Sequence, residues 1–185
     1  MRLTADVFAE LGFDGATISA ISKAIGVPTS TIYYNFDGKL EILAFLMRDW
    51  LERTEVAVRE AVAGPGSPVI RLGRVLDAYI HSMAHDPSTC QVLFAENGRI
   101  GRVPEISEGI QEVFHRPLAE LLAQGAADGS LSEKPVDTVA SAIYGAATFL
   151  GLRQIIQSDG GIPAFDPGPV SAEFTEIVLK GILTE

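Results

Sequence analysis

The twenty residues from 17 to 36, TISAISKAIGVPTSTIYYNF, decide the fold of this chain. Thr17 is a favourable N-cap for a short helix, and isoleucines recur on one face of that helix at steps of three and four residues. Gly26 can adopt a positive φ and end the helix, and Pro28 suits the first turn of a second one. Two short helices joined by a tight turn that contains glycine predict a helix-turn-helix.

The second of these helices has two chemically different faces. Ile32 faces inward, whereas Thr29, Ser30 and Tyr33 share the opposite face. This opposite face is small, hydroxylated and aromatic, so it can approach a major groove closely, hydrogen-bond to base edges and contact thymine methyl groups. A helical hairpin with no role in DNA binding is the alternative, although core packing alone does not require these residue types at exposed positions.

The rest of the chain predicts an all-α fold of about nine helices. No segment sustains the period-two alternation of a β-strand, and apolar residues recur instead at three- and four-residue steps. A long helix is expected from about Lys39 to residue 63, followed by a helix capped by Ser67. We expect a helix over 104–127 with an interruption possible at Pro117, a loop over 160–169, and a last helix capped by Ser171.

Charge and cysteine content narrow the class of protein. The 185 residues include 24 acidic and 14 basic side chains, a net charge of −10, which argues against a surface coated with basic patches for nucleic acid. The first fifty residues carry four basic and six acidic side chains, a net charge of −2. A single cysteine, Cys90, excludes an internal disulfide and fits a reducing cytoplasm. No signal peptide is evident, and no apolar run suggests a membrane span.

A set of spaced residues between positions 3 and 46 resembles the N-terminal domain of the TetR family of transcriptional regulators. The resemblance implies a helix-turn-helix DNA-binding domain over residues 1–50 and a ligand-binding and dimerisation domain over residues 51–185. Beyond residue 46 the chain is similar to the family only in the number and length of its helices. The residues that carry the resemblance are Phe8, Gly12, Phe13, Thr17, Ile21, Gly26, Val27, Thr31, Ile32, Tyr33, Tyr34, Phe36, Lys39 and Leu43.

The resemblance also implies roles for individual residues. Thr29, Ser30 and Tyr33 occupy the positions that read bases. The chain departs from the family where Asn35 and Ser22 stand in place of the common His and Ala. Family members usually carry basic residues ahead of the first helix, whereas this chain begins inside that helix, so we expect a basic arm upstream in the full gene product. The residues at positions where family members contact DNA phosphates are Thr17, Thr31, Tyr34, Asn35 and Lys39.

The larger domain is expected to dimerise and to enclose a ligand. By resemblance, the helices over 136–158 and 171–183 pack against their mates in a four-helix interface; an ordinary buried helix in a monomer is the alternative. The apolar bias predicts a small, hydrophobic ligand, although aromatic and methionine stripes are more often plain core. Trp50 is expected to pack the two domains together. The candidate lining residues are Tyr79, Met83, Phe94, Phe114, Leu118, Leu122, Tyr144, Thr148 and Phe149.

The predicted function is therefore a homodimeric cytoplasmic repressor that binds a palindromic operator and is released by a small molecule. The alternative is a ligand-binding protein of the same fold without sequence-specific DNA binding. A metal-sensing site formed by His81, His85, Asp86 and Cys90 is a further possibility, but a helix break is expected at Asp86. No catalytic motif is present, so neither an enzyme nor a cofactor is expected.

Overall fold

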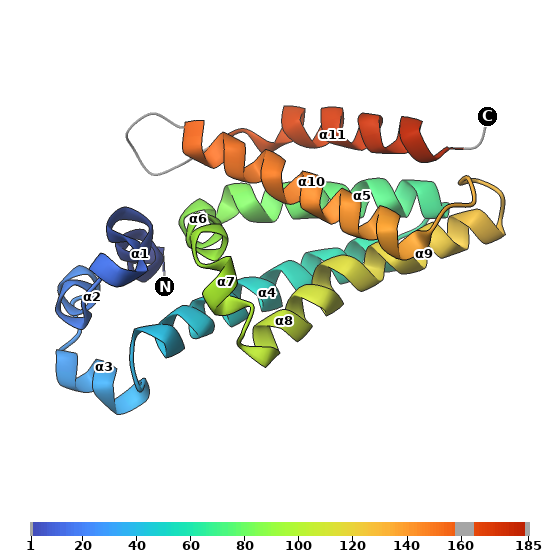
Figure 1. Ribbon diagram of the computed structural model, residues 1–185. Helices are drawn as coiled ribbons and strands as arrows, with labels where there is room; N and C mark the ends of the chain where they lie inside the picture. Colours follow the sequence, from blue (N-terminus) through green and yellow to red (C-terminus); the bar gives the residue numbers. More distant parts are fainter. Residues whose placement is uncertain (1, 158–164, 184–185) are drawn as a thin grey trace.

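The computed structural model describes residues 2–157 and 165–183 of the chain. Figure 1 shows three short helices at one end of an elongated bundle of longer helices. The described residues form no β-strand, so the predicted all-α fold is confirmed. The helices are α1 (Arg2–Gly15), α2 (Ile18–Ile25), α3 (Thr29–Asn35), α4 (Lys39–Ala63), α5 (Pro68–His85), α6 (Pro87–Ala95), α7 (Asn97–Ile100), α8 (Pro104–Ile110), the π-helical segment η1 (Gln111–His115), α9 (Arg116–Ala127), α10 (Val136–Gln157) and α11 (Pro167–Ile182).

The number of helices exceeds the expected nine by one. The segments α8, η1 and α9 follow one another without a break, so the described ranges contain ten helices. The additional helix is α7, a single turn within a stretch whose glycines predicted a break. Pro117 does not interrupt the helix that contains it.

The helix-turn-helix has the local structure that its sequence predicts. The Thr17 side chain caps α2 by accepting a hydrogen bond from the Ala20 amide at 3.0 Å. Gly26 ends α2 with a φ of 70°, in the left-handed region that favours glycine. Ile21 and Ile32 are buried, so the two helices pack through the inward faces expected for them.

The side chain of Lys39 holds the end of α1 against the start of α4. Its ammonium group donates to the carbonyls of Phe13, Asp14 and Ala16, at 2.7, 3.3 and 2.8 Å. These carbonyls lie at the end of α1, where a helix leaves acceptors without intrahelical donors. A cation there also interacts favourably with the helix dipole. The same ammonium lies 4.9 Å from the centre of the Phe13 ring, and the Arg99 guanidinium of α7 lies 4.4 Å from that centre.

The last helix begins earlier than predicted. α11 is capped by Asp166, whose carboxylate accepts a hydrogen bond from the Gly168 amide at 3.1 Å, with Pro167 in the first turn. The prediction of Ser171 as the cap is wrong, because an Asp-Pro pair already starts the helix. Ser171 is instead buried inside α11 and donates to Asp77 of α5 at 2.6 Å. Residues 160–164 of the predicted loop lie outside the described residues.

A tyrosine from α5 compensates for the proline in the α8–α9 helix. Pro117 has no N–H group to donate to the Val113 carbonyl, and the π-helical segment η1 lies just before it. The buried Tyr79 hydroxyl lies 3.2 Å from that carbonyl and 2.6 Å from the Phe114 carbonyl, so it supplies the missing donor. Burial raises the pKa of Tyr79 well above its ordinary value, which keeps the hydroxyl protonated.

Replacing Lys39 by Ala should lower the free energy of unfolding by about 1–2 kcal/mol, because carbonyls at the end of α1 lose their charged donor. Urea denaturation measures this change. Lys23→Ala, which removes an exposed lysine from α2, is the matched control and should change stability by less than about 0.5 kcal/mol. Equal stability of the two variants would contradict the role assigned to Lys39.

Replacing Tyr79 by Phe should lower the free energy of unfolding by roughly 1–3 kcal/mol, because the Val113 and Phe114 carbonyls lose the one hydroxyl proton that lies between them. The same substitution at Tyr34, whose side chain is 90% exposed, should leave the urea midpoint unchanged. A Tyr79→Phe protein as stable as the wild type would show that the backbone around Pro117 needs no side-chain donor.

Candidate functional site

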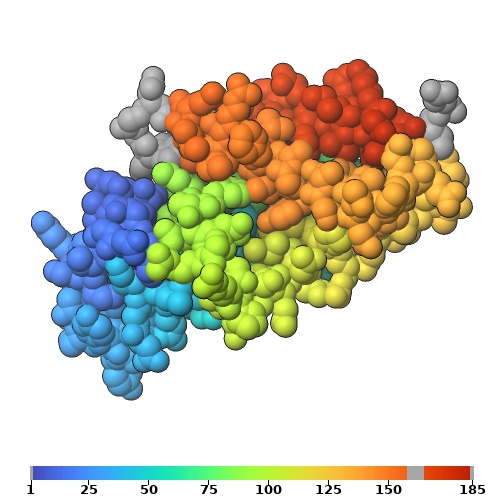
Figure 2. Space-filling model, viewed as in Figure 1, coloured from blue at the N-terminus to red at the C-terminus, as the bar shows by residue number. Residues whose placement is uncertain are grey.

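The outer face of α3 carries exposed side chains that no packing requirement explains. Thr29, Ser30 and Tyr33 are all exposed, Tyr33 at 62%. Ile32 alone is buried within α3. No hydrogen bond within the described chain uses the side chains of Thr29, Ser30 or Tyr33. In Figure 2 this segment lies at the end of the molecule farthest from α11, where a long straight partner could reach it.

The other residues predicted to contact DNA surround this face. Thr31, Tyr34 and Asn35 are exposed on α3, and the Asn35 amide donates back to the Thr31 carbonyl at 2.8 Å. Thr17 is exposed, and its oxygen is the α2 cap described above. Lys39, the remaining residue predicted to contact phosphates, uses its ammonium group here for three carbonyls that lie within α1 and the turn after it.

Few positive charges are available near α3. Among the basic residues of positions 1–50, Arg2 donates to the His85 carbonyl at 2.7 Å and Lys39 is committed to carbonyls. Arg48 is partly buried on α4. Lys23 is exposed on α2 without a hydrogen bond or ion pair to the described part of the chain. The face of α3 therefore offers hydroxyl groups and an aromatic ring rather than a basic patch.

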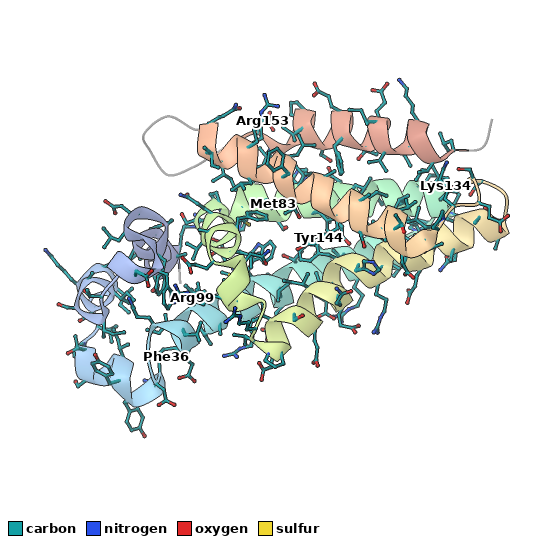
Figure 3. The ribbon with its side chains drawn as sticks, in the orientation of Figure 1. Phe36, Met83, Arg99, Lys134, Tyr144 and Arg153 are labelled. Atoms are coloured by element: carbon teal, nitrogen blue, oxygen red, sulfur yellow. The ribbon has the colours of Figure 1, made fainter. Side chains whose placement is uncertain are left out.

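An apolar cavity lies inside the bundle, with walls from α4, α5, α6, η1 and α10. Its volume is about 10 Å³, close to the least that one water molecule needs, so the walls are nearly closed. Met83 and Tyr144, labelled in Figure 3, lie on the inner side of α5 and α10. None of the lining side chains is charged. They are Trp50, Tyr79, Met83, Cys90, Leu93, Phe94, Phe114, Tyr144, Ala147 and Thr148.

Aromatic rings form one continuous wall of this cavity. Phe114 is at its centre and contacts three rings, with centroid distances of 5.5 Å to Trp50, 4.8 Å to Tyr79 and 5.1 Å to Tyr144. Gly151 lets α10 approach α5 here, because a Cβ at that position would overlap the sulfur of Met83. The cavity is thus built by close helix contacts and flat side chains, which favour an apolar occupant.

The structure brings six of the nine predicted lining residues to this cavity and leaves three elsewhere. Leu118 is fully buried in the core, one turn after Phe114. Leu122 borders a separate small cavity with Ser132 and Val136. Phe149 is 69% exposed, since one residue of helix rotation turns it away from the interior that Thr148 faces. The six that meet are Tyr79, Met83, Phe94, Phe114, Tyr144 and Thr148.

Sequence reasoning did not place Trp50, Cys90, Leu93 or Ala147 at the cavity. Trp50 was expected only to pack domains together, yet it is 4% exposed and borders the cavity on the α4 side. Ala147 lies three residues after Tyr144, a helical spacing that could have indicated a shared face. No comparable signal was available for Cys90 and Leu93, which depend on how α6 packs.

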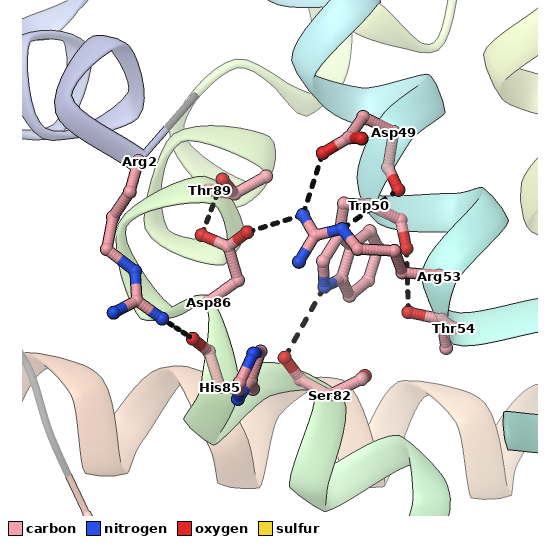
Figure 4. Close-up of polar contacts among 9 residues, drawn as sticks. All are labelled: Arg2, Asp49, Trp50, Arg53, Thr54, Ser82, His85, Asp86 and Thr89. Atoms are coloured by element: carbon pink, nitrogen blue, oxygen red, sulfur yellow. Dashed lines mark hydrogen bonds and ion pairs between the residues drawn. The ribbon is translucent and has the colours of Figure 1, made fainter.

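The metal-sensing alternative has no support in the arrangement of the side chains. Asp86 is buried and paired, its carboxylate oxygens lying 2.7 Å from Arg53 and 2.8 Å from Thr89 (Figure 4). The His81 ring lies 3.2 Å from Asp77 instead. Burial, more than the nearby Asp86, raises the pKa of the Cys90 thiol well above its ordinary value, so it stays protonated. No group of three or more potential ligands gathers among the residues described.

Helix α6 contacts both the N-terminal helices and the cavity. Ser88 at its start donates to Asp6 of α1 at 2.6 Å, while Cys90, Leu93 and Phe94 border the cavity. The ion pair between Asp86 and Arg53 ties the start of α6 to α4. A change in cavity volume would therefore displace α6, which also contacts α1.

The outer surface of α10 and α11 is apolar. Phe149 and Ile156 on α10 and Ile177 on α11 are each between 66% and 69% exposed. Figure 2 shows the two helices side by side on one face of the molecule. Within the described residues, α10 is the one helix long and apolar enough to cross a membrane, a property that the sequence reading overlooked. Its mixed exposure fits a helix that lies between a core and an uncovered apolar face.

Comparison with known proteins agrees with these features. Residues 1–45 match the family model described as "Bacterial regulatory proteins, tetR family". The chain is 24% identical to the HTH-type transcriptional repressor KstR2 of Mycolicibacterium smegmatis, over 98% of this chain and 88% of that protein. The structure of the ketosteroid transcriptional regulator KstR2 of Mycobacterium tuberculosis superimposes with a TM-score of 0.81 at 24% identity, covering 100% of this chain and 93% of that one.

A second similar structure was solved with a bound molecule. FadR of Bacillus subtilis, in complex with stearoyl-CoA, superimposes with a TM-score of 0.80 at 20% identity and covers 98% of each chain. These structures share the whole helical fold, and the family model matches the segment that contains the exposed face of α3. Residues 1–45 of the chain therefore match the N-terminal domain of the TetR family of bacterial regulatory proteins, and the described chain shares the helical fold of the regulators named here.

Proposed function

We propose that this regulator is a cytoplasmic homodimeric repressor that binds a palindromic operator and is released by a small, uncharged, largely apolar ligand. Residues 1–50 would form the DNA-binding domain and residues 51–185 the ligand-binding and dimerisation domain. Helix α4, which runs from Lys39 to Ala63, would belong to both. The family is one of regulators rather than enzymes, and the cavity offers binding surfaces rather than a set of catalytic groups.

The exposed face of α3 is the observation that carries the DNA-binding part. Tyr33, beside Thr29 and Ser30, is 62% exposed and therefore buries little of its ring in the core. Folding alone does not favour an aromatic side chain at such a position. In a major groove the same ring and hydroxyl groups can contact base edges and thymine methyl groups. We therefore assign base reading to Thr29, Ser30 and Tyr33, with Thr17, Thr31, Tyr34 and Asn35 on the phosphates.

The apolar face of α10 and α11 supports the dimer. Burying Phe149, Ile156 and Ile177 against a second copy would remove exposed apolar surface from water. Two-fold symmetry would then present two α3 helices to successive major grooves, which lie about 34–36 Å apart in a palindromic site. Burial of α10 in a dimer interface would also account for its apolar composition, so a membrane is not needed to explain that composition.

The ligand would enter a cavity that is nearly closed in the present structure. Its uncharged lining disfavours a buried charge, because no counterion is available there. The ligands associated with similar proteins are compatible with this lining: the stearoyl chain of the FadR complex is a hydrocarbon, and the KstR2 structure is described as a ketosteroid regulator. Both are mostly apolar bodies, and we propose that the effector of this chain has that character.

Release would follow from a population shift between two states of the dimer. A ligand that binds the expanded cavity more tightly would favour the conformation that contains it. The size of this population shift is limited by the difference between the ligand's affinities for the two states. The connections from α6 to α1 and α4, through Ser88, Asp86 and Arg53, would carry the expansion to α3. The recognition helices would then no longer match the groove spacing.

The net charge of −2 over the first fifty residues favours one rival function. A protein of this fold could bind its ligand without binding a specific DNA sequence, since few cations are available for phosphate contacts. The two functions differ in whether the outer face of α3 distinguishes one DNA sequence from another.

Replacing Tyr33 by Ala should weaken binding to the operator by roughly 1–3 kcal/mol, because the contacts to base edges are lost. Binding to random DNA should change much less. Fluorescence anisotropy with an operator selected from a random-sequence library and with a scrambled duplex measures both. An equal loss on the two duplexes would remove the base-reading role from Tyr33.

Replacing Phe149 or Ile177 by Asp should convert a dimer into a monomer, because a charge would be buried at the interface without a partner. Light scattering should give twice the 19.7 kDa chain mass for the wild type and the single chain mass for each variant. Val56→Asp, on an apolar position of α4 that is 53% exposed, is the control and should stay dimeric. A monomeric wild type, or variants that remain dimeric, would contradict this interface.

A further inference from the structure

We infer that the Tyr144 hydroxyl is the group by which the cavity selects its ligand, and that the ligand presents a carbonyl oxygen to it. This inference rests on the proposed ligand-binding function and adds the chemical class of the ligand. Some polar atoms of the cavity wall are already engaged by the protein itself, and only the others are available to a ligand.

Two of the polar side chains in the wall are committed to backbone carbonyls. The Tyr79 hydroxyl is held by the Val113 and Phe114 carbonyls of η1. The Trp50 indole N–H points at the Ser82 carbonyl, 3.4 Å away. A ligand could engage either donor only by breaking a hydrogen bond that the protein already makes, which is unfavourable. These two residues therefore contribute ring surface rather than hydrogen bonds to a ligand.

The remaining polar groups gather around Tyr144. Thr148 lies one turn further along α10 and borders the same cavity, and its hydroxyl opposes the rise in the pKa of Tyr144 that burial causes. Cys90 is close enough to raise the same pKa further, and its protonated thiol is only a weak donor. Unlike the Tyr79 hydroxyl, the Tyr144 hydroxyl donates to no backbone carbonyl of the described residues, so its proton remains available to an acceptor on a ligand.

A carbonyl oxygen is the ligand group that matches this site. It accepts the Tyr144 proton without bringing a charge into a wall that has no counterion. Next to Tyr144 stands the ring of Phe114, and beyond it those of Trp50 and Tyr79, so a flat or hydrocarbon body attached to the carbonyl has apolar surface to cover. The carbonyl could belong to a ketone or to an acyl thioester, which share this chemistry.

Two uncharged fluorescent probes test the inference. Prodan is a naphthalene that carries a ketone, and its emission shifts to the red when its carbonyl accepts a hydrogen bond. Phenylnaphthylamine has a similar apolar body without a carbonyl. Trp50 is the single tryptophan of the chain and borders the cavity, so energy transfer from it shows that a probe is bound there.

Replacing Tyr144 by Phe should weaken Prodan binding by about fivefold to tenfold, the loss of one neutral hydrogen bond. It should also shift the emission of bound Prodan to the blue, and it should leave phenylnaphthylamine binding unchanged. Thr148→Val, which removes the group that orients the tyrosine hydroxyl, should give a smaller loss for Prodan alone. Because both substitutions nearly conserve volume, a general distortion of the cavity would affect both probes.

The possible failures can be told apart. If phenylnaphthylamine receives no energy from Trp50 in the wild type, the cavity takes no apolar ligand, and the proposed function fails together with the inference. If the wild type binds both probes and Tyr144→Phe changes both affinities by the same factor, only the inference is overturned. Competition by methyl undecyl ketone and by dodecanoyl-CoA then shows whether the carbonyl belongs to an uncharged ketone or to a thioester.

Discussion

The position of the helix-turn-helix depends on the ammonium group of Lys39. It lies at the first residue of α4 and donates to carbonyls at the end of α1, so it fixes the angle between the helix that supports α2 and α3 and the long helix of the bundle. The Phe13 ring lies between this ammonium and the Arg99 guanidinium of α7. Lys39 therefore has a structural role in this chain, in addition to the phosphate contact that the sequence resemblance implies for its position.

The cavity is stable in its nearly closed form because aromatic rings and Met83 fill it, and a bound ligand must replace their contacts. Helix α6 forms one wall of the cavity and is also tied to α1 through Ser88 and to α4 through Asp86. In the proposed mechanism, helix α6 would therefore transmit an expansion of the cavity to the N-terminal helices. A ligand can act on DNA binding only if its affinity differs between two states of the protein, and the contacts of α6 would couple those states to the position of α1.

Local signals predicted the fold well, and contacts between distant residues could not be predicted. Thr17 and Gly26 determine the ends of α2 through their own hydrogen bond and backbone angle, so the sequence alone identified them. The partners of Lys39 are more than twenty residues away, and no periodicity indicates them. The apolar pattern of α10 did not show which of two neighbouring residues faces the interior, so both Thr148 and Phe149 were expected at the cavity. In the structure Thr148 borders the cavity and Phe149 is exposed.

We propose that sequence-specific DNA binding comes from the hydroxyl-rich face of α3 rather than from a basic surface. Fluorescence anisotropy against the DNA that flanks the gene, over a range of salt concentrations and with random DNA as control, tests it most directly. We expect preference for the flanking DNA and saturation at two chains per site. The slope of log K against log salt should be between about −2 and −4, because each chain offers only one or two uncommitted cations to phosphates. No preference over random DNA at low salt, or a slope as steep as about −8, would contradict this account.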